Sequence, residues 1–94
     1  MIIKFSKVFQ LDVIDQVCYI YKEKPRAALK FRKDLIKNIK KDLKHPFHFK
    51  KSIYSDGDEN IRDYVFKGYI SVYKIDVEQG IIIVFGFIKY KDSL

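Results

Sequence analysis

The chain has 94 residues, which suits one compact domain and leaves no material for a second hydrophobic core. Hydrophobic residues make up 48% of it and aromatic residues 16%, a composition that excludes an intrinsically disordered chain. The 19 Lys and Arg against 12 Asp and Glu give a net charge of +7, which suits nucleic acid, the ribosome, an acidic protein or an anionic surface as a partner.

Cysteine usage and the N-terminus bear on the cellular compartment. The single cysteine, Cys18, excludes an internal disulfide and fits a reducing cytosol. The N-terminus has neither a long apolar segment nor a small-residue cleavage site, so no signal peptide is expected. The apolar run Ile81–Ile88 is far shorter than the roughly 20 residues that a membrane-spanning helix needs. We therefore expect a cytoplasmic protein with no membrane partner.

The N-terminal part predicts a strand and then a helix. Ile2–Phe5 is a short apolar strand, expected at a sheet edge, and the Ser6 hydroxyl can cap the helix that follows. That helix is predicted over Val8–Tyr21, where apolar residues recur at helical spacing. Cys18 lies beside them, and we expect a small buried thiol there rather than a nucleophile, because no base is positioned to activate it.

A second, two-sided helix is predicted from Pro25 to about Lys44. At about 100° per residue, its apolar side consists of Ala28, Phe31, Leu35, Ile39 and Leu43. The opposite side carries a row of cations that we call the basic stripe: Arg26, Lys30, Lys33, Lys37, Lys40 and Lys44. Two interpretations of the stripe stay open. It is either an ordinary solvated face or a ridge that binds an acidic or phosphate-bearing partner.

The segment after this helix predicts connections rather than chemistry. Pro46 ends the helix. His45 and His48 have the spacing of half a metal site, but no cysteine or acid is spaced to complete it, so no metal site is predicted. Residues 49–54 are expected to form a short strand or an extended arm, and residues 55–60 a solvated turn.

Three antiparallel strands are predicted to follow, at Ile61–Phe66, Tyr69–Val77 and Ile81–Ile88. A Lys-Gly pair and a Glu-Gln-Gly run supply the two turns, since glycine readily takes the positive φ that a hairpin turn requires. The last strand is apolar almost throughout, without alternation. That pattern predicts a central strand covered on both faces, the most buried of the three, with Phe85 inside the core.

The order of these elements and several short patterns carry a resemblance to a known family. The patterns are P-R-A-A…F at the start of the second helix, K-H-P after it, and F-K-G-Y…V-Y-K-I-D across the first hairpin of the sheet. Over about Lys7 to Lys91 the chain resembles the RelE/ParE superfamily of toxins from bacterial type II toxin–antitoxin modules. The resemblance implies an α+β fold, in which an N-terminal helical hairpin packs on a small antiparallel sheet as one domain over residues 1–94.

RelE-type members of this superfamily cut messenger RNA on the ribosome, using cationic and tyrosine side chains as acids, bases and charge stabilisers. This chain departs from their pattern. Ile70 follows Gly68-Tyr69 where an arginine is expected, no histidine follows His48, and the chain ends before the late tyrosine. If the protein is a nuclease, the catalytic candidates that the resemblance leaves are Arg62, Lys89, Tyr90 and Lys91.

ParE-type members lack that catalytic set and inhibit DNA gyrase. Arg62 stands where ParE-like members tend to carry an arginine. The resemblance therefore favours a toxin that binds a cellular target, gyrase first. It leaves two alternatives: a RelE-like ribosome-dependent mRNA endonuclease, and an inert toxin-derived interaction module.

All three possibilities imply the same partner. A small acidic antitoxin, encoded by the neighbouring reading frame, would wrap the basic surface with a segment that is disordered when free. The target or antitoxin would contact the basic stripe. No cofactor is implied, whether the protein is an enzyme stays open, and a homodimer is possible in principle.

Overall fold

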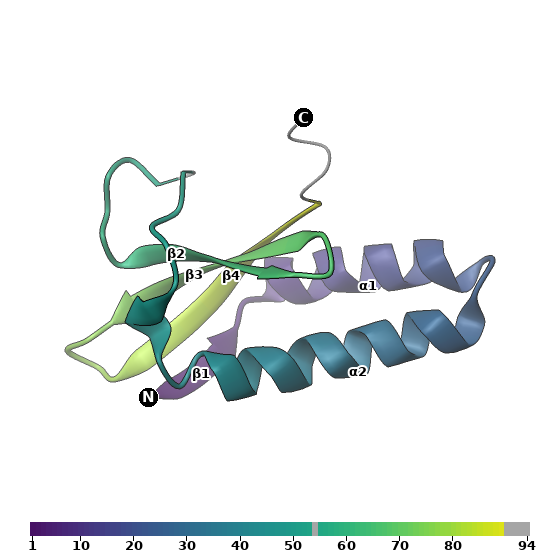
Figure 1. Cartoon of the computed structure of the whole chain (residues 1–94), viewed down its shortest axis with the longest axis horizontal. Helices are drawn as coiled ribbons and strands as arrows, with labels where there is room; N and C mark the ends of the chain where they lie inside the picture. The colour runs from purple at the N-terminus through teal and green to yellow at the C-terminus, as the bar shows by residue number, and fades with distance from the viewer. Residues whose placement is uncertain (54, 90–94) are drawn as a thin grey trace.

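The computed structural model describes residues 1–53 and 55–89. The elements in those ranges, in chain order, are β1 (Ile2–Phe5), α1 (Lys7–Tyr21), α2 (Pro25–Asp42), the 3-10 helix η1 (Pro46–His48), β2 (Ile61–Phe66), β3 (Tyr69–Asp76) and β4 (Ile81–Lys89). They form two layers: the hairpin of α1 and α2 lies against one face of the sheet and extends past it (Figure 1). No helix in the two described ranges is long and apolar enough to cross a membrane.

The sheet has the strand order β1-β4-β3-β2. β2, β3 and β4 form the predicted antiparallel meander, joined by the two predicted turns. β1 lies at one edge, as predicted, but it pairs with β4 in parallel, so the sheet as a whole is mixed. Parallel pairing is possible here because the helical hairpin and two strands separate β1 from β4 along the chain.

The first helix is capped by Ser6 as predicted, but Cys18 is not buried as predicted. The Ser6 hydroxyl accepts a hydrogen bond from the Phe9 backbone N–H at 3.1 Å, which caps the first turn of α1. Phe9 and Val13 are buried in the core. Cys18, however, is exposed, so the prediction of a buried thiol was wrong. It follows Val13 by five positions, which places it about 140° around the helix, away from the sheet.

The second helix supplies most of the buried residues of the helical layer. All five residues of its predicted apolar side are buried: Ala28, Phe31, Leu35, Ile39 and Leu43. Two tyrosines of the sheet hold the end of α2 and the start of η1. The Tyr64 hydroxyl donates to the Asp42 carboxylate, and the Tyr73 hydroxyl donates to the Pro46 carbonyl at 2.5 Å. Burial raises the pKa of both hydroxyls, and for Tyr64 the Asp42 carboxylate adds to the rise, so both remain protonated donors.

The prediction that β4 is covered on both faces was wrong. β4 is central, but only one face of the sheet is covered by helices, and Ile83 and Phe85 are 37% and 38% exposed on the other. The more buried strand is β3, whose residues 70–73 are all buried. A bulge also changes which positions of β4 face the core. Val72 pairs with Gly86 and Tyr73 with Val84, which leaves Phe85 as an extra residue that reverses which positions face the core.

The β2–β3 turn gives the first testable prediction. Lys67 and Gly68 have φ of 47° and 83°, the left-handed pair of a tight hairpin turn, and a Cβ on Gly68 would meet no atom within 4 Å. Gly68→Val should therefore destabilise through the backbone alone, by about 1–3 kcal/mol, measured by urea unfolding. Gly68→Asn is the matched control and should lose less, since asparagine tolerates this conformation. Equal stability of the valine variant and the wild type would contradict this turn geometry.

The open face of the sheet gives the second prediction. Phe9, on α1, is fully buried in the core between the helices and the sheet, whereas Phe85 is 38% exposed. Phe9→Ala should cost about 3–5 kcal/mol of unfolding free energy, as truncation of a buried phenylalanine does. Phe85→Ala should cost clearly less, because much of its ring already contacts water. Equal losses in thermal or urea unfolding would mean that something covers the open face.

Candidate functional site

Arg62, on β2, binds the backbone of the loops beside it. Its guanidinium donates hydrogen bonds to the backbone carbonyls of Glu59 at 3.0 Å, Phe47 at 3.1 Å and Phe49 at 2.7 Å. It also lies over the Phe47 ring, 5.2 Å from the ring centroid. These contacts tie η1 and the chain after it to the start of β2. These hydrogen bonds give Arg62 a structural role. Its N–H donors are directed at backbone carbonyls of the protein itself.

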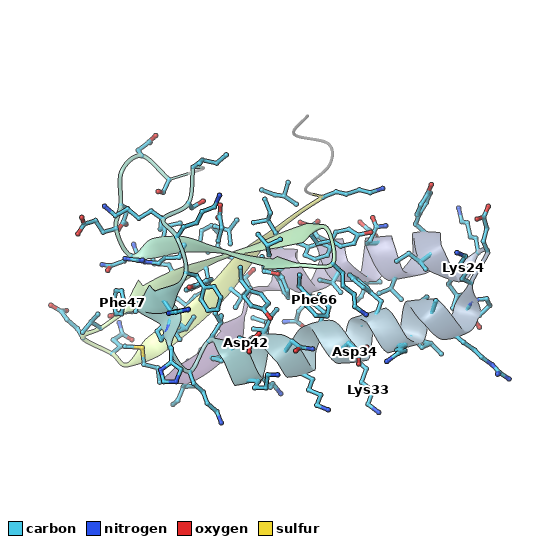
Figure 2. All side chains as sticks on the ribbon, in the orientation of Figure 1. Lys24, Lys33, Asp34, Asp42, Phe47 and Phe66 are labelled. Carbon is cyan, nitrogen blue, oxygen red and sulfur yellow. The ribbon has the colours of Figure 1, made fainter. Side chains whose placement is uncertain are left out.

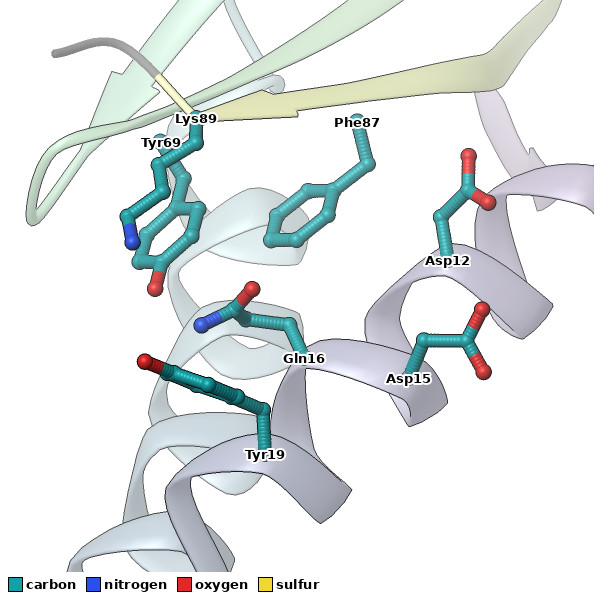
Figure 3. Close-up of a pocket in the computed structure, with 7 residues that line it drawn as sticks. All are labelled: Asp12, Asp15, Gln16, Tyr19, Tyr69, Phe87 and Lys89. Atoms are coloured by element: carbon teal, nitrogen blue, oxygen red, sulfur yellow. The ribbon is translucent and has the colours of Figure 1, made fainter. Parts of the chain in front are cut away.

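Lys89, at the end of β4, lines a cavity of about 250 Å³ between the sheet and α1. Figure 3 shows Lys89, Tyr69 and Phe87 reaching from the sheet toward Tyr19 and Gln16 of α1. The Lys89 ammonium lies 5.8 Å from the Tyr19 ring centroid. The helical wall also carries two carboxylates, Asp12 and Asp15. Their negative charge opposes the binding of an RNA phosphate in this cavity.

The structure does not bring Arg62 and Lys89 together. Arg62, on β2, is paired with Tyr73 of the neighbouring strand β3. Lys89, on β4, is paired with Tyr69 at the opposite edge of the same strand. Those two β3 positions are about 13 Å apart along the strand, and β2 and β4 are separated by a further ~10 Å. The other two nuclease candidates, Tyr90 and Lys91, lie outside the described residues. Arg62 and Lys89 therefore do not form a joint acid–base site.

Other polar groups in the sheet also fail to converge. Asp63 and Ser71 are both buried, and neither Asp63 Oδ1 nor Ser71 Oγ has a hydrogen-bond partner. They lie on neighbouring strands, but Asp63 is opposite Val72 and Ser71 is opposite Tyr64, so they point to opposite faces of the sheet. In residues 1–53 and 55–89 no group of three or more His, Cys, Asp and Glu side chains could hold a metal ion.

The basic stripe is fully displayed to solvent. All six of its side chains are exposed, and Lys33 points away from the sheet in Figure 2. Only Lys30 has an acidic partner among the described residues, the Asp34 carboxylate at 2.9 Å, and this hydrogen bond lowers the pKa of Asp34. The remaining cations of the stripe present unpaired charge, which suits a negatively charged partner.

A groove adjoins the stripe on the same side of the helical hairpin. One part of it, about 490 Å³, is lined by Arg32, Lys33, Ile36, Lys37 and Lys40. A smaller part, between α1 and α2, is lined by Phe9, Gln10, Val13, Ile14, Arg32 and Ile36. The two parts share Arg32 and Ile36, and we call them together the outer groove. It combines an apolar floor with a cationic rim.

The outer groove lies on a third side of α2, which a division of this helix into an apolar side and a basic stripe does not predict. Leu29, Arg32 and Ile36 recur at intervals of three and four residues between the apolar side and the basic stripe. Leu11 and Ile14 have the same spacing on α1. The available signal was an apolar sector on α2 that is wider than packing against the sheet requires.

Comparison with solved structures shows what kind of fold this is. A chain described as "Chromosomal ParDE TA system from P. aeruginosa" matches with a TM-score of 0.77 at 13% sequence identity, covering 95% of both chains. At that identity the match shows the fold alone. The helical hairpin on a four-stranded sheet is therefore an α+β fold shared with that chain, and an α+β fold is what the resemblance implied.

Comparison of the sequence with known families is more specific. The family described as "ParE toxin of type II toxin-antitoxin system, parDE" matches residues 3–91. The chain therefore belongs to the ParE toxin family. No curated protein matches the sequence.

The contacts of Arg62 give the third prediction. Arg62→Lys keeps the charge but loses the planar guanidinium, so it should lower the unfolding free energy by about 1–3 kcal/mol. Lys89→Gln is the comparison variant and should change stability by no more than ~1 kcal/mol, because its cation–π contact is only partly shielded from water. Urea unfolding measures both. If Arg62→Lys is as stable as the wild type, the guanidinium is free to serve another purpose.

Proposed function

We propose that this ParE-family protein is a cytoplasmic, single-domain toxin that arrests growth by binding DNA gyrase, and that a small acidic antitoxin neutralises it. The observation that carries the proposal is the arrangement of its cations. Six exposed cations line up along α2 and just after it as the basic stripe, while Arg62 of the sheet donates its hydrogen bonds to backbone carbonyls of the protein itself. That arrangement suits binding to a large partner rather than acid–base chemistry on the sheet.

Membership of the ParE family supports gyrase over the ribosome as the target. The geometry at Lys89 supports the same choice. An RNA-cutting site needs cations around the phosphate, and the cavity beside Lys89 places Asp12 and Asp15 there instead. The RelE-like alternative therefore rests on Tyr90 and Lys91, which lie outside the described residues.

The antitoxin part of the proposal rests on charge and on the family. The chain carries a net charge of +7, and within residues 1–53 and 55–89 most of the basic stripe has no acidic partner. An acidic partner would neutralise this surface and gain from attraction before contact, which raises the association rate. The prediction for the genome is a short acidic reading frame beside the toxin gene.

Gyrase inhibition is the fourth prediction. Purified protein should inhibit supercoiling of relaxed plasmid by gyrase, and the inhibition should saturate with protein concentration. A thermally unfolded sample and the destabilised Phe9→Ala variant serve as controls, because a binding surface built on the packed hairpin requires the fold. Topoisomerase I relaxation of the same plasmid controls for coating of DNA by a basic protein.

Full gyrase activity at saturating concentrations of folded protein would refute gyrase as the target. In that case, a test for growth arrest after induction without antitoxin distinguishes a toxin with another target from an inert interaction module. An arrest without gyrase inhibition points to another target, and the absence of any arrest favours an inert interaction module.

A further inference from the structure

The cavity beside Lys89 has a helical wall whose charge is opposite to that of the protein as a whole. The wall consists of Asp12, Asp15, Gln16 and Tyr19, which recur at three- and four-residue spacing and so share one side of α1. Within residues 1–53 and 55–89, neither carboxylate has an ion-pair partner. A protein with a net charge of +7 therefore presents unpaired negative charge at this wall.

The opposite wall is aromatic and belongs to the sheet. Tyr69 of β3 and Phe87 of β4 lie on the side that faces the helices, with ring centroids 5.1 Å apart and ring planes at 6° to each other. Phe87 also contacts the buried Phe9 edge to face, so the core holds its ring in place. Figure 3 shows both rings pointing from the sheet toward Gln16 and Tyr19. The cavity thus combines aromatic rings with carboxylates.

Lys89 already places a cation against one of these rings. Its ammonium lies 5.8 Å from the centroid of the Tyr19 ring, a distance at which a ring attracts a positive charge. It does not neutralise the helical wall, because no ion pair joins it to Asp12 or Asp15. The two carboxylates of the cavity are therefore available to a cation from outside.

We propose that this cavity binds the guanidinium of an arginine side chain from a partner protein. A guanidinium is planar, so it stacks on the ring of Tyr19 or Phe87, and its N–H groups donate in pairs to a carboxylate of α1. A lysine ammonium has neither the flat face nor the paired donors. This site lies apart from the basic stripe, and the proposal does not depend on gyrase being the target.

The size of the cavity suits a single side chain. Its volume is about 250 Å³, which is smaller than the roughly 300–1,000 Å³ of pockets that enclose drug-sized ligands. The apolar stem of an arginine can lie along aromatic rings while its charged end reaches the polar wall. The cavity therefore fits an arginine that projects from the surface of a docked protein.

Other ligands match these walls less well. A phosphate, free or in a nucleic acid, would be repelled by Asp12 and Asp15. A metal ion would need more ligands than two carboxylates, and in residues 1–53 and 55–89 no group of three or more His, Cys, Asp and Glu side chains could hold one. A purely apolar side chain would take water away from the carboxylates without replacing its hydrogen bonds. A guanidinium satisfies both walls.

The need for charge is tested with a blocked tripeptide that carries arginine between two alanines. It is titrated into the full-length protein and followed by NMR of the tyrosine and phenylalanine ring signals. The signals of Tyr19, Tyr69 and Phe87 should shift and saturate. The matching citrulline peptide, whose side chain has the same length but a neutral urea group, should bind about tenfold more weakly or less, because it cannot pair with a carboxylate.

The acidic wall is tested by removing its charge. Asp12→Asn with Asp15→Asn should weaken binding of the arginine peptide by about fivefold or more. Asp56→Asn with Glu78→Gln is the matched control, since it changes the net charge equally at exposed positions outside the helices and strands, and it should leave the affinity unchanged.

Lys89→Gln should strengthen binding of the arginine peptide by about twofold, because it removes a like charge from the cavity. A site for anions would respond in the opposite direction.

The aromatic contribution is tested at Tyr19, which is 65% exposed and outside the core. Tyr19→Leu should weaken binding of the arginine peptide by about two- to threefold, since it removes a ring from the cation. Tyr21→Leu is the matched control. Tyr21 is 50% exposed on the same helix but about 200° around it from Tyr19, so its loss should have no effect.

Several outcomes would overturn the proposal: no saturable shift with the arginine peptide, equal binding of the citrulline peptide, or an affinity that the paired asparagine substitutions leave unchanged. Weaker binding after Lys89→Gln would also overturn it and assign the cavity to an anion. Circular dichroism verifies the fold of each variant, and the citrulline comparison, which needs no variant, decides the question if a variant unfolds. No gyrase and no antitoxin enter these measurements, so a failed supercoiling assay would leave their outcome unchanged.

Discussion

The burial of one side of α2 against the sheet is the constraint on which the rest of this structure depends. Leu35 and Ile39 are fully buried, together with Tyr73, Ile82 and Val84 of the sheet. Each such aliphatic side chain contributes about 1.5–3 kcal/mol on leaving water, so the rotation of α2 about its axis is fixed. Once it is fixed, the opposite side must face solvent. The basic stripe and the rim of the outer groove are therefore displayed by the same packing that folds the chain.

The same packing decides which cations are available to a partner. Those of α2 project into water from a helix whose end is held by Tyr64, while Tyr73 holds the start of η1 just after it. Arg62 differs from them, because the backbone carbonyls of the loops around it accept hydrogen bonds from its guanidinium. Two kinds of basic side chain thus have different roles because of their surroundings, one holding loops together and the other presenting charge. A protein organised in this way is suited to binding another macromolecule over a broad helical surface.

Periodicity in the sequence was enough to predict the helices, the meander and the five buried residues of the second helix's apolar side, the last of which is the C-cap of α2. A helix with one apolar side has only one orientation that removes that side from water. It failed where a local event changed the period. The bulge at Phe85 changed which positions of β4 face the core, and an apolar run that looked buried on both faces has one open face. Cys18 was misplaced because proximity to apolar neighbours in the sequence does not fix the angle around a helix. The outer groove depends on how α1 and α2 lie beside each other, and Arg62 on loops that fold back to it, so neither was visible in one element's pattern.

The central claim is that this ParE-family toxin acts by binding and does not cut RNA. Mapping transcript 5′ ends genome-wide, before and after induction in cells that lack the antitoxin, tests it most directly. We expect growth to stop while the positions of the 5′ ends within coding sequences stay as they were. New 5′ ends that recur at codon spacing within translated messages would contradict the claim and support the RelE-like endonuclease alternative.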